Sequence, residues 1–470
     1  MEKSKLLQLL KSFGRQEWRS FLDFVASPYF NTRTELTELA RYLEGRLTGN
    51  PADVPDKKAA FGHLFPGLPY DEKMMRYLLS DLFRLAARYL AVKRYEQQER
   101  RVQLDQLHCF IDHNQPKAYS RLRDKVEQSL SEVHLMDEDH YFHLFMLAEI
   151  EEHNFTLQKV RRNDPFIQMA SDRLDAYFCL KKLKYSCNML DRQAILQTDY
   201  NLTFTDEILG FLERKDFLNQ DILRFYGAIF RSLKEENNEA HYFELRRLLR
   251  ERAGNFSADD LRDIYYLAIN FCARKIRKGE EAFAREALEL YLDGIERKVL
   301  FESGHLSPFA FTNVVKLALR LQRFKWIEEF IRRYSPNLPE RFRQNALHYN
   351  LAELYYYTRD YDKALEFLNQ VKFSDLNYHL GSRVMLAKIY YETREDPALS
   401  SLLAAFTLFL KRNRAISDEI KQTYLNFCDI LVRILRKDPE NRTEIRSVVE
   451  NTDRLTDRSW LMNILDEAQG

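Results

Sequence analysis

Two ten-residue segments in the C-terminal part of the chain are close copies of each other. Leu351–Asp360 and Leu386–Glu395 align without a gap, are identical at six of ten positions and are offset by 35 residues. A period near 34 residues is typical of helix-turn-helix repeats. Because one hairpin is too small to bury its own apolar face, such repeats stack on their neighbours. The two segments therefore predict a stack of helical hairpins.

The remainder of the chain also has the periodicity of helices. Apolar residues recur at three and four positions along almost every segment. Only 13 glycines and 12 prolines occur in 470 residues, which indicates few turns and long helices. Helices are expected to start at Thr32, Ser257 and Ser417, where a hydroxyl precedes acidic residues, and a long helix is expected from about Asp71. The sequence predicts an all-α fold.

We predict three regions along the chain. They are an N-terminal helical module at 1–100, a helical middle region without an obvious repeat at 101–255, and helical repeats at 256–470. A break is expected at Ser27–Asn31, because Pro28 cannot donate a helical hydrogen bond.

The first repeat segment and the residues that follow it resemble the tetratricopeptide repeat (TPR) family. Small residues stand where two helices must approach closely, and tyrosines stand where hairpins meet. The matching residues are Leu351, Ala352, Tyr355, Asp360, Tyr361, Ala364 and Leu368. The second copy is degenerate, because Leu399 replaces the small residue of its second helix. Further hairpins are expected at 314–333 and 264–291.

The resemblance implies an α-solenoid of TPR-like hairpins in the C-terminal half, preceded by irregular helical regions. Ser27–Asn31 together with these repeats also looks like a group of cytosolic TPR-like proteins of Bacteroidota that have no established activity. That likeness supports the predicted fold and does not assign a function.

In TPR arrays the first helices of the hairpins line a groove, and the helical register places five residues of this chain there. They are Tyr349, Glu353, Tyr356, Lys388 and Tyr391. Tyrosines with mixed charge suit a bound peptide or helix. The lysine and asparagine clamp with which the family captures a C-terminal carboxylate is not reproduced, since Glu353 stands where a neutral or basic donor is needed.

Basic clusters suggest a second interpretation, binding of nucleic acid. The chain has 72 basic and 71 acidic residues, so such binding needs a local patch. Arg246, Arg247 and Arg250 are the main candidates, with smaller clusters at 159–162 and 181–184. Interleaved acids favour a solvated helix face with local ion pairs over a phosphate-binding surface.

The sequence contains no motif of a known enzyme class. Glycine-rich phosphate loops, H-E-x-x-H, C-x-x-C and G-x-S-x-G do not occur. His140 and His143 have helical spacing suited to a metal, but packing histidines are the favoured interpretation. Cys179 and Cys187 are expected to be buried structural thiols. We therefore expect neither catalysis nor a cofactor, while an unfamiliar catalytic site stays an open alternative.

The favoured hypothesis is a non-enzymatic scaffold or adaptor that binds a protein or peptide partner. No membrane association is expected, because the longest apolar stretch, near 402–410, is shorter than a bilayer span. Cytoplasmic localisation is the expectation, and the sequence leaves the oligomeric state open.

Overall fold

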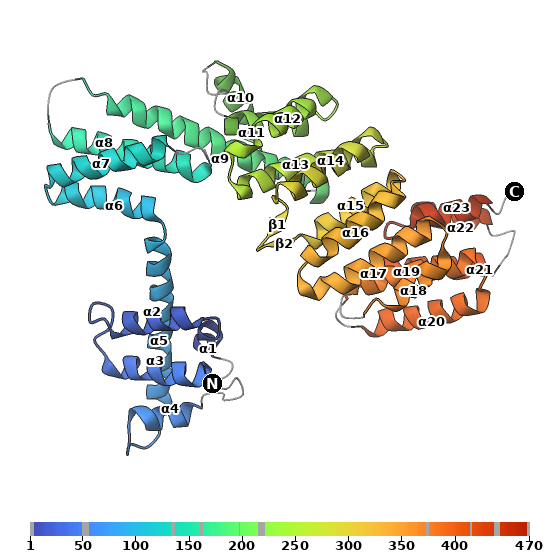
Figure 1. Cartoon of the computed structure of the whole chain (residues 1–470), viewed down its shortest axis with the longest axis horizontal. Helices are drawn as coiled ribbons and strands as arrows, with labels where there is room; N and C mark the ends of the chain where they lie inside the picture. Colours follow the sequence, from blue (N-terminus) through green and yellow to red (C-terminus); the bar gives the residue numbers. More distant parts are fainter. Residues whose placement is uncertain are drawn as a thin grey trace. The chain divides into compact units, whose positions relative to one another are not determined.

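The computed structural model describes residues 4–48, 56–132, 137–159, 163–196, 198–214, 221–372, 376–413, 416–436 and 442–467. This part of the chain is all-α, apart from one very short hairpin of strands, and its helices pack mostly in sequential pairs (Figure 1). The all-α prediction is confirmed. Contacts divide the chain into two compact units, Met1–Phe178 and Cys179–Gly470, with the division inside helix α9.

The first unit contains eight helices and the beginning of a ninth in its described part. They are α1 (Lys5–Leu10), α2 (Arg15–Ala26), α3 (Thr34–Leu47), α4 (Lys57–Leu64), α5 (Glu72–Glu96), α6 (Glu99–Asp112), α7 (Pro116–Ser131), α8 (Glu138–Leu157) and α9 (Phe166–Leu196). Helices α1 to α5 enclose an apolar core built around Trp18, Phe21, Leu39 and Met75. A smaller core joins α6, α7 and α8.

The second unit continues with helices in sequence order. They are α10 (Thr205–Arg214), α11 (Asp221–Lys234), α12 (Glu239–Arg252), α13 (Ala258–Arg277), α14 (Ala282–Glu296), α15 (Pro308–Arg320), α16 (Phe324–Tyr334), α17 (Glu340–Tyr357), α18 (Tyr361–Asn369), α19 (Leu376–Glu392), α20 (Asp396–Arg412), α21 (Asp418–Leu435), α22 (Arg442–Asn451) and α23 (Arg458–Glu467). Short 3-10 helices follow α12 and α16 at Ala253–Asn255 and Ser335–Asn337.

Predicted helix starts agree with the structure at three of four positions. The side chains of Ser257, Ser417 and Asp71 each accept a backbone N–H of the first helical turn, as N-caps do. At Thr32 the prediction is wrong, because α3 begins two residues later. Asn31 organises this break instead: its amide donates to the carbonyl of Val25 at 2.9 Å, while its oxygen accepts the N–H of Arg33. Residues 49–55, between α3 and α4, lie outside the described residues.

The same turn closes successive helix pairs of the second unit. In each turn one residue adopts a left-handed backbone conformation. In chain order these residues are Gly279, Gln322, Arg359 and Arg394. The next N–H then bonds a carbonyl five residues back, as Asp360 does to Tyr355 at 2.9 Å. This hydrogen bond satisfies a free carbonyl at the helix end and reverses the chain. The recurrence explains the pairs α13–α14, α15–α16, α17–α18 and α19–α20.

The paired helices form layers that contact the next pair. The first helices meet one another, α15 with α17 and α17 with α19, and Figure 1 shows this order from yellow to orange. Ala352 and Ala364 are fully buried between α17 and α18, where larger side chains would keep the helices apart. Met385 and Ile389 of α19 extend the same core. The expected hairpins in this region are confirmed as helix pairs.

Two features of the second unit lie outside the helix-pair pattern. Strands β1 (Phe301–Glu302) and β2 (His305–Leu306) form a hairpin through Ser303 and Gly304, both left-handed, as a tight two-residue turn requires. At the other end, α22 and α23 pack on α19 to α21 through buried side chains such as Leu461. Within the described residues, every helix is too short or too polar to span a bilayer.

Candidate functional site

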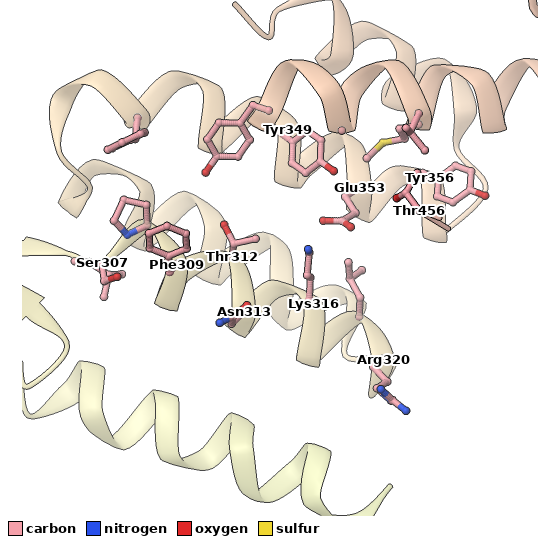
Figure 2. Close-up of a pocket in the computed structure, with 18 of the residues that line it drawn as sticks. Ser307, Phe309, Thr312, Asn313, Lys316, Arg320, Tyr349, Glu353, Tyr356 and Thr456 are labelled. Carbon is pink, nitrogen blue, oxygen red and sulfur yellow. The ribbon is translucent and has the colours of Figure 1, made fainter. Parts of the chain in front are cut away.

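A cavity of about 1630 Å³ lies along the first helices of the pairs in the second unit. Its wall comes from α15, α17 and α19, with the β1–β2 hairpin at one end and α21 and residues 456–459 at the other. Figure 2 shows the side chains of α15 facing those of α17 across it. This cavity is hereafter the groove.

Aromatic rings supply much of the surface of the groove. Tyr349, Tyr356 and Tyr357 come from α17 and Tyr378 from α19. Phe309, at the start of α15, is 78% exposed and points into the open space (Figure 2). A ring held on a rigid helix and left in water is a ready apolar contact for a partner.

Four of the five predicted groove residues line this cavity. Tyr349, Glu353, Tyr356 and Lys388 are brought together there. Tyr391 lies outside the lining and packs edge-on against Trp460 of α23, with ring centroids 5.4 Å apart. The helical register thus located four residues of the wall, whereas Tyr391 contacts the C-terminal helix α23 instead of lining the groove.

The polar side chains at the α23 end of the groove hold one another. Lys388 forms an ion pair with Asp457 at 2.8 Å, and its ammonium lies 4.7 Å from the centre of the Tyr356 ring. Glu392 accepts hydrogen bonds from Tyr356 at 2.5 Å and from Trp460 at 2.7 Å. These contacts fix this end of the groove within the chain itself.

Glu353, unlike Lys388 and Glu392, is not held by another described side chain. Its Oε2 is shielded from solvent, and no described residue donates a hydrogen bond to this carboxylate. Burial raises the pKa of Glu353 above its usual value, an effect opposed by the positive charges of Lys316 and Lys388 and reinforced by Asp457. A desolvated carboxylate without a donor is costly for stability, and such groups concentrate at functional sites.

A glycine shapes the wall beside Glu353. A Cβ at Gly381 of α19 would lie 2.6 Å from the hydroxyl of Tyr349, closer than atoms can approach. The missing side chain therefore admits the Tyr349 ring, which packs against Tyr378 at 5.4 Å between centroids. Burial raises the pKa of Tyr349 well above its ordinary value, so the hydroxyl stays protonated and can donate.

Sequence reasoning missed several groove residues, above all Phe309 and Lys316 of α15 and Asp457 before α23. The periodicity of 314–333 predicts a hairpin but does not fix its register against the helix at 340–357. Alignment of α15 with α17 places Lys316 across the groove from Glu353 (Figure 2). No local signal marks Asp457, because it meets Lys388 across 69 residues of sequence.

The three candidate arginines for nucleic acid all form ion pairs with acidic residues of the described chain. Arg246 is buried and bonds Glu286 at 3.2 Å and Glu289 at 3.1 Å, both on α14. Arg247 lies 3.9 Å from Glu244, and Arg250 lies 3.7 Å from Glu289. Exposed Arg247 and Arg250 fit the solvated helix face that the interleaved acids suggested, whereas Arg246 is buried in the contact between α12 and α14. Residues 160–162 of the smaller cluster lie outside the described residues.

The other candidates for chemistry are packed side chains. His140 is buried, and burial lowers its pKa to about 4. Across the described part of the chain, no three His, Cys, Asp or Glu side chains are placed to hold a metal ion together. Cys179 and Cys187 are both buried, as expected, and burial raises the pKa of the Cys187 thiol.

A scan against protein-family models, a search of curated proteins and a search of solved structures each found no match for this chain. The resemblance to TPR proteins therefore stays a prediction.

Proposed function

We propose that the chain is a non-enzymatic interaction protein whose second unit is a TPR-like α-solenoid that binds a segment of a partner protein in the groove. The observation that carries this proposal is the groove itself. It runs along the first helices of successive helix pairs, where helical-repeat proteins present their binding surface.

The size of the groove favours a polypeptide over a small molecule. Small-molecule pockets usually enclose about 300–1,000 Å³. The groove has about 1630 Å³ and draws its lining from the first helices of four successive pairs, α13, α15, α17 and α19, and from α21. A ligand that contacts all these elements at once has the length of a peptide segment.

The chemistry of the lining suits the same class of ligand. Exposed Phe309 and the tyrosines of α17 offer apolar anchors, and both signs of charge stand among them. Aromatic anchors surrounded by polar groups are the usual composition of protein recognition surfaces. Adaptor or scaffold activity follows if one segment is held here while the first unit makes a separate contact.

A displayed library of random peptides, selected on the full-length chain, tests the proposal. Peptides that bind the groove are expected to lose binding at least tenfold when Phe309 is replaced by aspartate. The matched control is Phe243→Asp on α12, an exposed phenylalanine outside the groove, which is expected to leave binding unchanged. Peptides that bind both variants equally, or a selection that yields no binder, would contradict the proposal.

A further inference from the structure

Two opposite charges in the groove have no hydrogen-bond or ion-pair partner among the described residues. They are Glu353 on α17 and Lys316 on α15. Two other cations of the lining are paired, Lys388 with Asp457 and Arg320 with Glu281, while Glu302 and Arg341 add further charges to it. Lys316 and Glu353 are therefore a pair of opposite charges through which the groove can gain polar contacts.

The two side chains face each other without closing into an ion pair. Figure 2 shows the Lys316 ammonium and the Glu353 carboxylate pointing toward one another from opposite walls. The positive charge of Lys316 is felt at Glu353, where it opposes the rise in pKa that burial causes. A donor and an acceptor thus frame a gap inside the groove.

We propose that this gap receives a carboxamide, the side chain of an asparagine or glutamine in the bound segment. The inference rests on the proposed function, since it assumes that the groove holds a polypeptide. A carboxamide carries an acceptor oxygen and a donor NH2 group on one planar unit. Its oxygen accepts from the Lys316 ammonium, and its NH2 group donates to the Glu353 carboxylate.

Charge balance favours a neutral ligand group over a charged one. Lys316 and Lys388 contribute two positive charges near the gap, and Glu353 and Asp457 contribute two negative charges. A lysine or arginine of the partner would be attracted to the Glu353 carboxylate but repelled by the Lys316 ammonium. An aspartate or glutamate would be attracted to the Lys316 ammonium but repelled by the Glu353 carboxylate. A carboxamide satisfies both groups and adds no net charge to a partly desolvated site.

The walls beside the gap suit the methylene groups of such a side chain. Tyr349 and Tyr357 both lie within electrostatic influence of Glu353, because its negative charge helps to raise the pKa of each. Their rings offer an apolar surface next to the carboxylate. A glutamine can pack its stem on these rings while its amide reaches the two charges.

Peptides from the displayed library test the inference in two steps. First, groove-dependent peptides are expected to share an asparagine or glutamine at one position. Second, one such peptide and its Leu, Glu and Lys replacements at that position are titrated against the full-length chain. Each replacement is expected to weaken binding about tenfold, the loss typical of one to two hydrogen bonds to charged groups.

Variants of the chain show whether the loss arises at the gap. With Glu353→Met or Lys316→Met, the preference for the amide over leucine is expected to shrink to within about threefold, as coupled groups require. Matched controls are Glu366→Met on α18 and Lys325→Met on α16, both exposed and outside the groove, which should keep the tenfold preference.

The possible failures are distinguishable. Groove-dependent peptides without an amide preference would overturn the inference and leave the proposed function standing. Selection of lysine or arginine at the fixed position would overturn the inference and indicate that Glu353 binds a cation. Selection of aspartate or glutamate would overturn it and indicate that Lys316 binds an anion. A preference unchanged in both methionine variants would also overturn it. Only the absence of groove-dependent peptides contradicts the proposed function.

Discussion

The hydroxyl of Tyr356 donates a hydrogen bond of 2.5 Å to Glu392, joining α17 to the end of α19. Glu392 also accepts from Tyr361 of α18 at 2.5 Å and from Trp460 of α23 at 2.7 Å. One carboxylate therefore ties two neighbouring helix pairs to the C-terminal helices. Tyr356 is part of the framework of the groove as well as part of its surface.

Replacing Glu392 by alanine is expected to lower the free energy of unfolding of the second unit by about 1–3 kcal/mol. The physical reason is the loss of three hydrogen bonds to one charged acceptor, discounted because the carboxylate is exposed. Urea unfolding followed by tryptophan fluorescence measures the change. Glu366→Ala on α18 is the control, and an equal effect in the two variants would refute the assigned role of Glu392.

Gly381→Ala is expected to destabilise the chain by about 1–3 kcal/mol, although alanine normally stabilises a helix relative to glycine. The added methyl group would overlap the Tyr349 hydroxyl and displace its ring. Gly45→Ala on α3 is the matched control, because nothing lies within 4 Å of its added methyl group, and it should be neutral or stabilising by up to about 1 kcal/mol. Differential scanning calorimetry decides the sign. A stabilising effect at both positions would contradict the close contact.

Glu353→Gln is expected to stabilise the chain at pH 7 by about 1–2 kcal/mol, because it removes a desolvated charge. The pKa of Glu353 in the folded chain lies above its usual value of 4.5. The destabilisation caused by the charged carboxylate is therefore absent below the usual pKa and grows as pH rises from that value toward the folded pKa. The difference in unfolding free energy between variant and parent should increase from pH 4.5 to pH 7. A difference that is constant with pH would show that Glu353 has an ordinary pKa.

The fold was largely predictable because its signals are local. Periodicity and the 35-residue offset between Leu351–Asp360 and Leu386–Glu395 predicted α17 to α20 as helix pairs, since one repeat carries its own turn and packing residues. The β1–β2 hairpin was missed because strands of two residues are too short for any periodicity. At Thr32 the capping rule failed because Asn31, one residue earlier, forms the local side-chain hydrogen bonds to the backbone, and α3 begins at Thr34 without a side-chain cap.

The site was predictable only as far as the register of α17 and α19 could carry it. That register placed Tyr349, Glu353, Tyr356 and Lys388 on one wall. It could not show that Trp460 covers Tyr391, because this contact joins residues far apart in the sequence. The ion pairs of the basic cluster on α12 were equally hard to predict. Acidic partners of this cluster lie on α14, about 40 residues downstream, as well as nearby in the sequence.

Site-specific photo-crosslinking in cells tests the central claim most directly, that the groove holds a segment of a partner protein. A photoreactive amino acid is placed at Thr312, which faces the groove from α15 (Figure 2). In a separate control variant it is placed at Leu408 on α20, an exposed position outside the groove. The account predicts one or a few discrete crosslinked proteins from position 312, each mapping by mass spectrometry to a short segment, and their loss on adding Phe309→Asp. Equal crosslinking from both positions, or products that persist in Phe309→Asp, would contradict it.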